Sequence, residues 1–268
     1  MNAIPEVVTV GRISVDLYAQ QLDASFLDPQ TFTKSVGGSP TNVAIAAARL
    51  GHHAAVATKV GDDALGGYVR QQLDEWGVDT TYVGIGEGQT PVVLAALDPP
   101  EDPKIVFYRG AAAPDTQITT MDVPVEAVVG CRVLWVSFGA LAQGSTADTC
   151  QDWLDLRGRR GDVVLDLDYR PTLWPSRDAA HDVAIEAVRH STVVVGNRTE
   201  CEVAVGETDP DRAADALLAE GVRLAIVKKG GDGVLLATAE DRWTVPPVPI
   251  SVLCGLGAGD AFGGALIH

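Results

Sequence analysis

A glycine-rich tetrapeptide near the C-terminus, Gly257-Ala258-Gly259-Asp260, has residue types that point directly to chemistry. Small and apolar residues follow it and predict a helix over 260–268. A helix that begins here directs its free N–H groups and the positive end of its dipole at the glycine turn, which an anion can approach closely. The segment therefore predicts a phosphate site beside a carboxylate, Asp260, that can accept a proton. The alternative is a turn in which Asp260 is an ordinary residue of the first helical turn.

A second glycine turn, Gly37-Gly38, precedes a small-residue helix that we expect over 41–50. The glycines allow the backbone to approach a ligand, and Asn42 offers both a hydrogen-bond donor and an acceptor. The alternative for this segment is a loop in which Thr41 caps the helix. The two glycine turns are more than 200 residues apart, so only the fold can bring them together.

Two further segments carry polar groups or glycines at the ends of expected strands. Asn197 and Glu200 are three residues apart, which places them on one face of a helix where their oxygens could orient Mg²⁺ or its waters. Helix capping is the alternative for this pair. The run from Lys228 to Gly233 lies between two expected strands, where it predicts either a hairpin turn or a glycine-lined ledge for nucleotide phosphates. Neither a Walker A sequence nor a strand-linked GxGxxG is present.

These residues must be positioned by strands and helices that alternate along the chain. Apolar runs predict strands over 7–10, 54–60, 133–136, 163–165, 193–195, 224–227 and 234–238. Periodic patterns predict helices over 41–50, 64–76, 147–156, 179–189, 198–205 and 211–220. Continuous apolar strands that alternate with helices indicate a parallel sheet covered on both faces. Two patches of alternating strands, at roughly 12–36 and 90–112, indicate a small sheet inserted at one edge.

Composition bounds the class of protein further. The chain has 268 residues, enough for one large domain with an insertion, and a formal net charge of -16, which argues against a nucleic-acid surface. No apolar run has the length that a membrane span requires. The four cysteines form no CxxC pair, which suits reduced thiols, and neither a signal nor a transit peptide is recognisable, so we expect a cytoplasmic protein.

Together the two glycine motifs and the run of elements resemble the ribokinase-like (PfkB) sugar kinases over essentially the whole chain. The resemblance implies an α/β fold, a three-layer α/β/α sandwich with a mostly parallel central sheet and a small β-sheet lid, as one domain over 1–268 that is C-terminally short. It implies ATP and Mg²⁺ as cofactors and a homodimer formed through the lid. Many members carry Asp-Thr shortly before the late glycine turn, where Cys254-Gly255 stands here. Those residues help to build a monovalent-cation site in the family, so the resemblance does not extend to activation by K⁺.

By this resemblance each motif receives a role. The catalytic base is Asp260, with an anion hole formed by Gly257, Ala258 and Gly259. Sugar hydroxyls are held by Asp16, Gly38 and Asn42. Asn197 and Glu200 bind phosphate and, through water, Mg²⁺. The ATP site is lined by Lys228, Gly230 and Gly233.

Two arginines narrow the substrate class. Arg109 falls in the expected lid and Arg170 follows a strand of the main sheet. Guanidinium groups suit a carboxylate through bidentate contact, whereas a surface salt bridge is the alternative for each. The surrounding sequence most resembles kinases of 5-dehydro-2-deoxygluconate in inositol catabolism, and next those of 2-keto-3-deoxygluconate; fructokinases and ribokinases fit less well. Two other classes stay open, a non-catalytic sugar- or nucleotide-binding protein and an NAD-dependent oxidoreductase.

Overall fold

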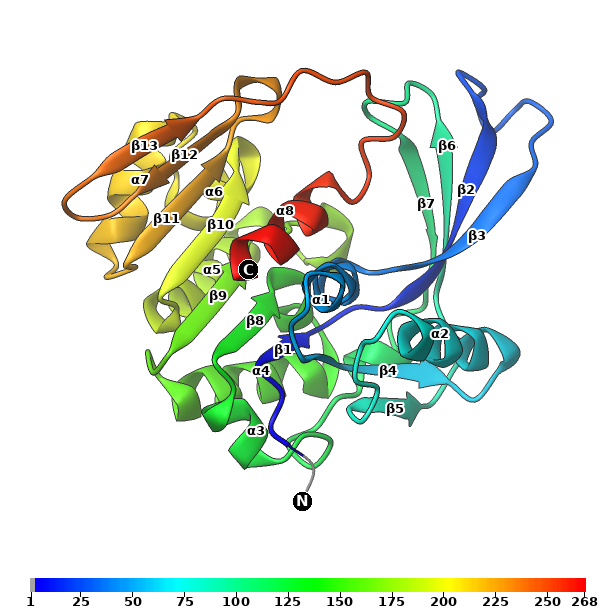
Figure 1. Cartoon of the computed structure of the whole chain (residues 1–268), viewed down its shortest axis with the longest axis horizontal. Coiled ribbons are helices and arrows are strands. Elements are labelled where there is room, and N and C mark those ends of the chain that lie inside the picture. The colour runs from blue at the N-terminus through cyan, green and yellow to red at the C-terminus, as the bar shows by residue number, and fades with distance from the viewer. Residues whose placement is uncertain (1–2) are drawn as a thin grey trace.

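The computed structural model describes residues 3–268, and its centre is a large twisted sheet (Figure 1). The strand order is β13-β12-β11-β10-β9-β8-β1-β4-β5. The strands are β1 Val7–Val10, β4 Ala54–Gly61, β5 Val83–Gly86, β8 Val133–Ser137, β9 Asp162–Asp166, β10 Val193–Asn197, β11 Leu224–Lys228, β12 Val234–Ala237 and β13 Arg242–Val245. Neighbouring strands from β5 to β11 are parallel, and β12 and β13 are added antiparallel at one edge.

A smaller sheet in the order β3-β2-β6-β7 projects beyond the main sheet (Figure 1). Its strands are β2 Ser14–Leu22, β3 Phe32–Gly37, β6 Val92–Leu97 and β7 Lys104–Tyr108. The chain enters this sheet directly from β1 and returns through β3 into the first helix, so the sheet is tied to the main body at the carboxyl end of β1. We refer to these four strands as the lid.

Helices cover both faces of the main sheet. One face packs against α1 Ser39–Arg49, α2 Ala64–Glu75 and α8 Ala258–Ile267, and the other against α3 Val125–Gly130, α4 Gly144–Arg157, α5 Arg177–His190, α6 Arg198–Val205 and α7 Pro210–Ala219. Because side chains alternate along a strand, β8 sends Trp135 to the first face and Leu134 and Val136 to the second. The predicted α/β/α sandwich with a small β-sheet lid is therefore confirmed. Within residues 3–268, no helix combines the length and the apolar character needed to cross a membrane.

Each strand and helix expected from the sequence is present, with ends shifted by a few residues, but two strands and one α-helix within residues 3–268 were not predicted. The missed strands are β5, which glycines interrupt, and β13, a short exposed edge strand. The missed helix, α3, has six residues and carries several valines, whose branched side chains favour strands. The late helix begins at Ala258, two residues before the predicted start.

Close packing of α8 against α1 decides where the late glycine turn lies. A Cβ atom added to Gly264 would lie 2.2 Å from the Cβ of Ala46, and one added to Gly263 would lie 2.8 Å from Trp135. Only glycine therefore allows the two helices this approach. The small residues that the sequence shows in both helices bring the N-terminus of α8 beside the N-terminus of α1.

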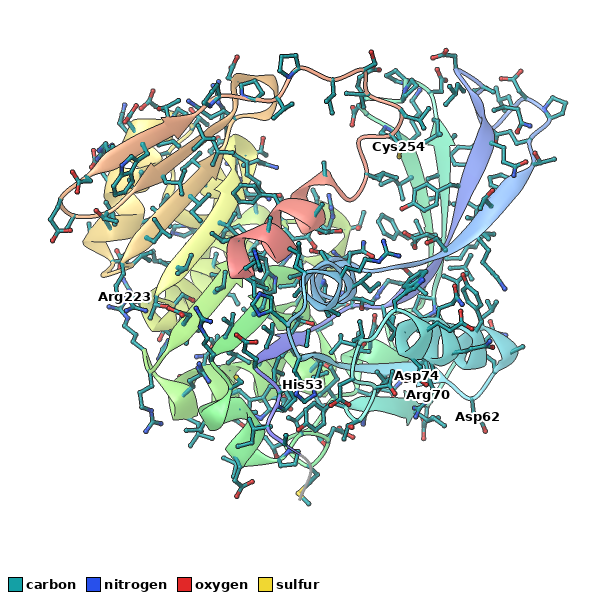
Figure 2. All side chains as sticks on the ribbon, in the orientation of Figure 1. His53, Asp62, Arg70, Asp74, Arg223 and Cys254 are labelled. Carbon is teal, nitrogen blue, oxygen red and sulfur yellow. The ribbon has the colours of Figure 1, made fainter. Side chains whose placement is uncertain are left out.

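A long connection, residues 246–257, leads from β13 to α8 past the lid. Figure 2 shows Cys254 near the lid strands, and the backbone N–H of Gly255 donates to the carbonyl of Pro100 at 2.9 Å. Pro100 belongs to the turn between β6 and β7. The segment that precedes the glycine turn is thus hydrogen-bonded to the lid.

Candidate active site

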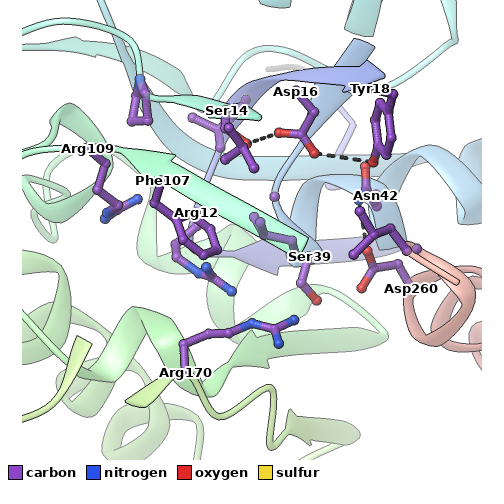
Figure 3. Close-up of a pocket in the computed structure, with 17 residues that line it drawn as sticks. Arg12, Ser14, Asp16, Tyr18, Ser39, Asn42, Phe107, Arg109, Arg170 and Asp260 are labelled. Atoms are coloured by element: carbon purple, nitrogen blue, oxygen red, sulfur yellow. Dashed lines mark hydrogen bonds between the residues drawn. The ribbon is translucent and has the colours of Figure 1, made fainter. Parts of the chain in front are cut away.

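A cavity lies between the lid and the carboxyl ends of the main-sheet strands (Figure 3). The lid contributes Asp16 and Phe107, and the body contributes Asn42, Arg170 and Asp260. Ligands of open parallel sheets bind at this edge because loops and helix N-termini converge there. The fold therefore brings together residues from both halves of the sequence.

Asp260 stands in the first turn of α8 and faces the cavity. The helix is preceded by Gly257, whose φ of 78° is in the left-handed region that favours glycine. The side-chain amide of Asn42 donates to Asp260 Oδ2 at 2.8 Å, across a sequence separation of 218 residues. Burial raises the pKa of Asp260, an effect that the hydrogen bond from Asn42 opposes and the charge of Asp168 reinforces. A carboxylate with a raised pKa in a cleft is well placed to accept a proton.

Asp16 lies on β2, on the lid side of the cavity. Its carboxylate accepts hydrogen bonds from Ser14 Oγ at 2.6 Å and from the Tyr18 hydroxyl at 3.4 Å, and burial raises its pKa. A Cβ atom on Gly37 would lie 2.1 Å from this carboxyl group. Glycine at position 37 therefore makes room for Asp16, a reason for the motif that the sequence pattern alone did not reveal.

Gly38 has a different structural role from Gly37. Its φ is 100°, and a Cβ atom there would lie 2.3 Å from the carbonyl oxygen of Arg12. The helix begins at Ser39 with Gly38 as its N-cap, so Thr41 lies inside the helix, and the alternative of a loop capped by Thr41 is wrong. The structure thus brings the predicted sugar-site residues Asp16, Gly38 and Asn42 to one cavity.

Both predicted arginines line the cavity, and each faces an aspartate. Arg109 donates from Nη1 and Nη2 to the two oxygens of Asp115, at 2.8 Å each. Arg170 Nη2 lies 2.8 Å from Asp168 Oδ1. Arg12, which sequence reasoning did not single out, lines the same cavity and pairs with Asp168 Oδ2. The cavity wall is therefore richer in guanidinium groups than the sequence indicated.

Asn197 and Glu200 form a capping box at the start of α6. Asn197 Oδ1 accepts the backbone N–H of Glu200 at 2.9 Å, and Glu200 Oε2 accepts the backbone N–H of Asn197 at 2.6 Å. Such reciprocal bonds satisfy two orphan N–H groups of the helix. The capping alternative therefore describes the local structure, although Glu200 is buried and not solvated. The magnesium role of the pair stays a prediction.

Lys228 ends β11 at the same edge of the sheet. Its ammonium lies 3.8 Å from Asp166 Oδ1 and 3.8 Å from Glu200 Oε2, and a Cβ atom on Gly259 would lie 3.4 Å from it. Burial would lower the pKa of Lys228, but the charges of the surrounding carboxylates, Asp166 and Glu200 foremost among them, together outweigh burial and raise it. Burial raises the pKa of Asp166 to about 7. Lys228 is thus a half-buried cation next to the glycine turn that precedes Asp260.

Gly230 and Gly233 belong to the turn that joins the antiparallel strands β11 and β12. Their φ values are 61° and 84°, and a Cβ atom on Gly233 would lie 2.1 Å from the carbonyl oxygen of Val245. The hairpin interpretation therefore accounts for both glycines. Their place in an ATP site stays a prediction.

Sequence reasoning missed several cavity residues, among them Arg12, Ser39 and Phe107. Arg12 follows a glycine at the carboxyl end of β1. Ligand-binding residues gather at this position in parallel sheets, so its place after the first strand could have identified Arg12. Ser39 adjoins Gly38, and its hydroxyl donates to Asp166 Oδ2 at 3.3 Å. Phe107 lies on a lid strand, and the alternation of apolar residues along that strand did not indicate which of them face the cavity.

Comparison with known proteins identifies the family and the fold of this chain. The family described as pfkB family carbohydrate kinase matches residues 5–268. A protein named 5-dehydro-2-deoxygluconokinase from Geobacillus thermodenitrificans is 30% identical over 283 residues, which cover 100% of this chain and 84% of the relative. A PfkB protein from Polaromonas sp. JS666 has a similar fold, with a TM-score of 0.86 at 24% identity over 98% of this chain and 87% of that one. A putative ribokinase II from E. coli, in complex with ATP and Mg²⁺, has a TM-score of 0.84 at 23% identity over 98% and 85% of the two chains.

Proposed function

This chain belongs to the pfkB family of carbohydrate kinases and is a phosphotransferase that acts on a sugar hydroxyl, and we propose that its acceptor is a sugar acid, 5-dehydro-2-deoxygluconate. The primary hydroxyl of this acid receives the γ-phosphoryl group of ATP. The observation that carries the proposal is one cavity that presents a half-buried carboxylate, Asp260, together with guanidinium groups. Family membership sets aside the oxidoreductase and the non-catalytic binding protein.

Asp260 acts as the general base in this proposal. As the acceptor oxygen attacks phosphorus, Asp260 takes the hydroxyl proton, and Asn42 holds the carboxylate in place through its 2.8 Å bond to Oδ2. The free N–H groups at the start of α8 face the charge that develops on the transferred phosphoryl group. Lys228 lies close enough to the same turn to add a positive charge.

A magnesium ion fits the donor set at the end of β10. Mg²⁺ in phosphotransferases uses one or two carboxylates together with waters and substrate phosphates, so Glu200 with Asn197 beside it suffices. Glu200 is bonded through Oε2 to the helix N-terminus, and no hydrogen bond within residues 3–268 engages its Oε1. When bound, the ion would neutralise phosphate charge, while Glu200 and Asn197 would hold its waters.

Glu200→Gln separates capping from metal binding. A Gln oxygen can still accept the Asn197 N–H, so we expect the melting temperature to change little. The lost charge should raise the Mg²⁺ concentration needed for half-maximal activity by about tenfold, a typical effect of removing a partner around a metal site. Magnesium titrations of activity and thermal melts test this. An unchanged magnesium requirement would assign Glu200 to capping alone.

An assay of ADP release over a panel of acceptors tests the substrate. We expect turnover with 5-dehydro-2-deoxygluconate at a kcat/KM at least about 100-fold above fructose and ribose, because a neutral sugar leaves the cavity guanidiniums without an anion. 2-Keto-3-deoxygluconate, which also offers a carboxylate to the arginines, is the alternative acceptor. Equal rates with neutral sugars would remove the sugar-acid assignment and leave the kinase.

The predicted homodimer through the lid stays a prediction. Exposed apolar side chains on the lid strands, among them Phe32, Val106 and Tyr108, support it.

A further inference from the structure

The three arginines of the cavity differ in what already holds them. Arg109 uses both terminal nitrogens on Asp115, whose side chain is fully buried and also accepts the backbone N–H of Ile13 at 3.0 Å. Releasing Arg109 to a ligand would leave a buried carboxylate without its cation, which is strongly unfavourable. Arg109 is thus a positioning residue that ties the end of β7 to the backbone beside Arg12.

Arg12 and Arg170 share a single carboxylate. Asp168 Oδ2 pairs with Arg12 Nη2, and Asp168 Oδ1 lies 2.8 Å from Arg170 Nη2. Of the Arg12 nitrogens, only Nη2 has a hydrogen-bond partner within residues 3–268, and the buried Nε has none. One negative charge between two positive charges leaves these three side chains with a net positive charge. Figure 3 shows both guanidinium groups directed into the cavity, on the side opposite Asp16.

The other side of the cavity is acidic. Asp16 and Asp260 line it, and burial raises the pKa of both, as expected where their charges are poorly solvated. A ligand carboxylate is therefore repelled from this side and attracted to Arg12 and Arg170. A hydroxyl group, by contrast, can donate to Asp260.

We propose that Arg12 and Arg170, and not Arg109, bind the carboxylate of the substrate, with Asp168 as the anchor that sets their spacing. This inference rests on the proposed function and adds the direction in which the substrate binds. The carboxylate lies at the Arg12 end and the acceptor hydroxyl at the Asp260 end, so the hydroxyl that is phosphorylated is remote from the carboxylate in the carbon chain. Arg12 then sets specificity for acids over neutral sugars.

Steady-state kinetics of Arg12→Gln and Arg170→Gln, with 5-dehydro-2-deoxygluconate and with fructose, test the inference. Each substitution should raise KM for the acid by about 10- to 100-fold, the range for loss of a hydrogen bond to a charged group, with kcat altered by less than about threefold. The KM for ATP should not change, and the preference for the acid over fructose should fall by the same factor. Arg170 is 45% exposed, so its variant keeps the test valid where Arg12→Gln folds poorly.

Arg177→Gln is the matched control, because it removes an arginine from an exposed ion pair with Glu202 and should leave both KM values unchanged. Arg109→Gln should lower the melting temperature. The inference is overturned where Arg109→Gln raises KM for the acid selectively while the Arg12 and Arg170 variants do not. A wild-type enzyme that phosphorylates fructose and no sugar acid would overturn the proposed substrate class as well, so the two failures are distinguishable.

Discussion

Asp260→Asn should lower kcat by about 10³-fold, because asparagine has nearly the same shape but cannot accept the hydroxyl proton. The amide oxygen can still accept the bond from Asn42, so the N-terminus of α8 keeps its position. The affinity for ATP should therefore change by less than about threefold, since the lost interaction is one made only in the transition state. Initial rates at saturating acceptor and nucleotide titrations measure the two quantities.

The pH profile of the wild-type enzyme provides a second readout of the same base. Burial raises the folded pKa of Asp260, so the carboxylate gains its proton at a pH above that of an ordinary aspartate. Since the base must be ionised, activity should be lost as the pH falls through this raised pKa. Asp182→Asn, at an exposed position on α5, is the control and should leave rate and profile unchanged. A normal rate in the Asp260 variant would rule out its role as the base.

Gly264→Ala should produce the second large effect, on stability and rate together. The new methyl group would lie 2.2 Å from the Cβ of Ala46, so α8 must move away from α1, at a cost of about 1–3 kcal/mol of unfolding free energy. Because Asp260 and Asn42 stand on these two helices, the movement lengthens their bond. We expect kcat to fall by at least about tenfold, as small misplacements of catalytic groups are costly. Thermal unfolding and initial rates check both effects.

The double variant Gly264→Ala/Ala46→Gly should restore much of the loss, since the added methyl group enters the space that the removed one filled. Gly67→Ala is the matched control, because no atom lies within 4 Å of a Cβ atom at that helical position. That substitution should be neutral or slightly stabilising. A single Gly264→Ala variant with normal stability and rate would show that helix contact does not position Asp260.

Much of the fold could be predicted from local pattern. The apolar run 193–195 and the periodic segment 198–205 were recognisable because a buried strand and an amphipathic helix differ in their spacing of apolar residues. Short elements such as α3 were missed because six residues hold too little periodicity. The two glycine motifs identified Asp260 and Asn42, because glycine marks positions at which backbone conformation or close approach is constrained.

The arginines show what a local sequence pattern cannot predict. In the sequence Arg109 and Arg170 were equivalent candidates to bind a carboxylate, yet one is bonded to the fully buried Asp115 and the other shares Asp168 with Arg12. The sequence likewise left both capping and metal binding open for the Asn197–Glu200 pair, and the structure shows capping bonds.

By itself, then, the sequence determined the layers of the fold, the two glycine turns and the presence of a carboxylate at a helix start. These features depend on residues within one or two turns of each other, whose spacing can be read from the sequence. Only the tertiary structure decided that α1 and α8 meet through Ala46 and Gly264, and which two arginines share one carboxylate. The Arg12–Asp168 pair and the Ala46–Gly264 contact join residues more than 100 positions apart, and their energies depend on burial and distance, which no local pattern contains.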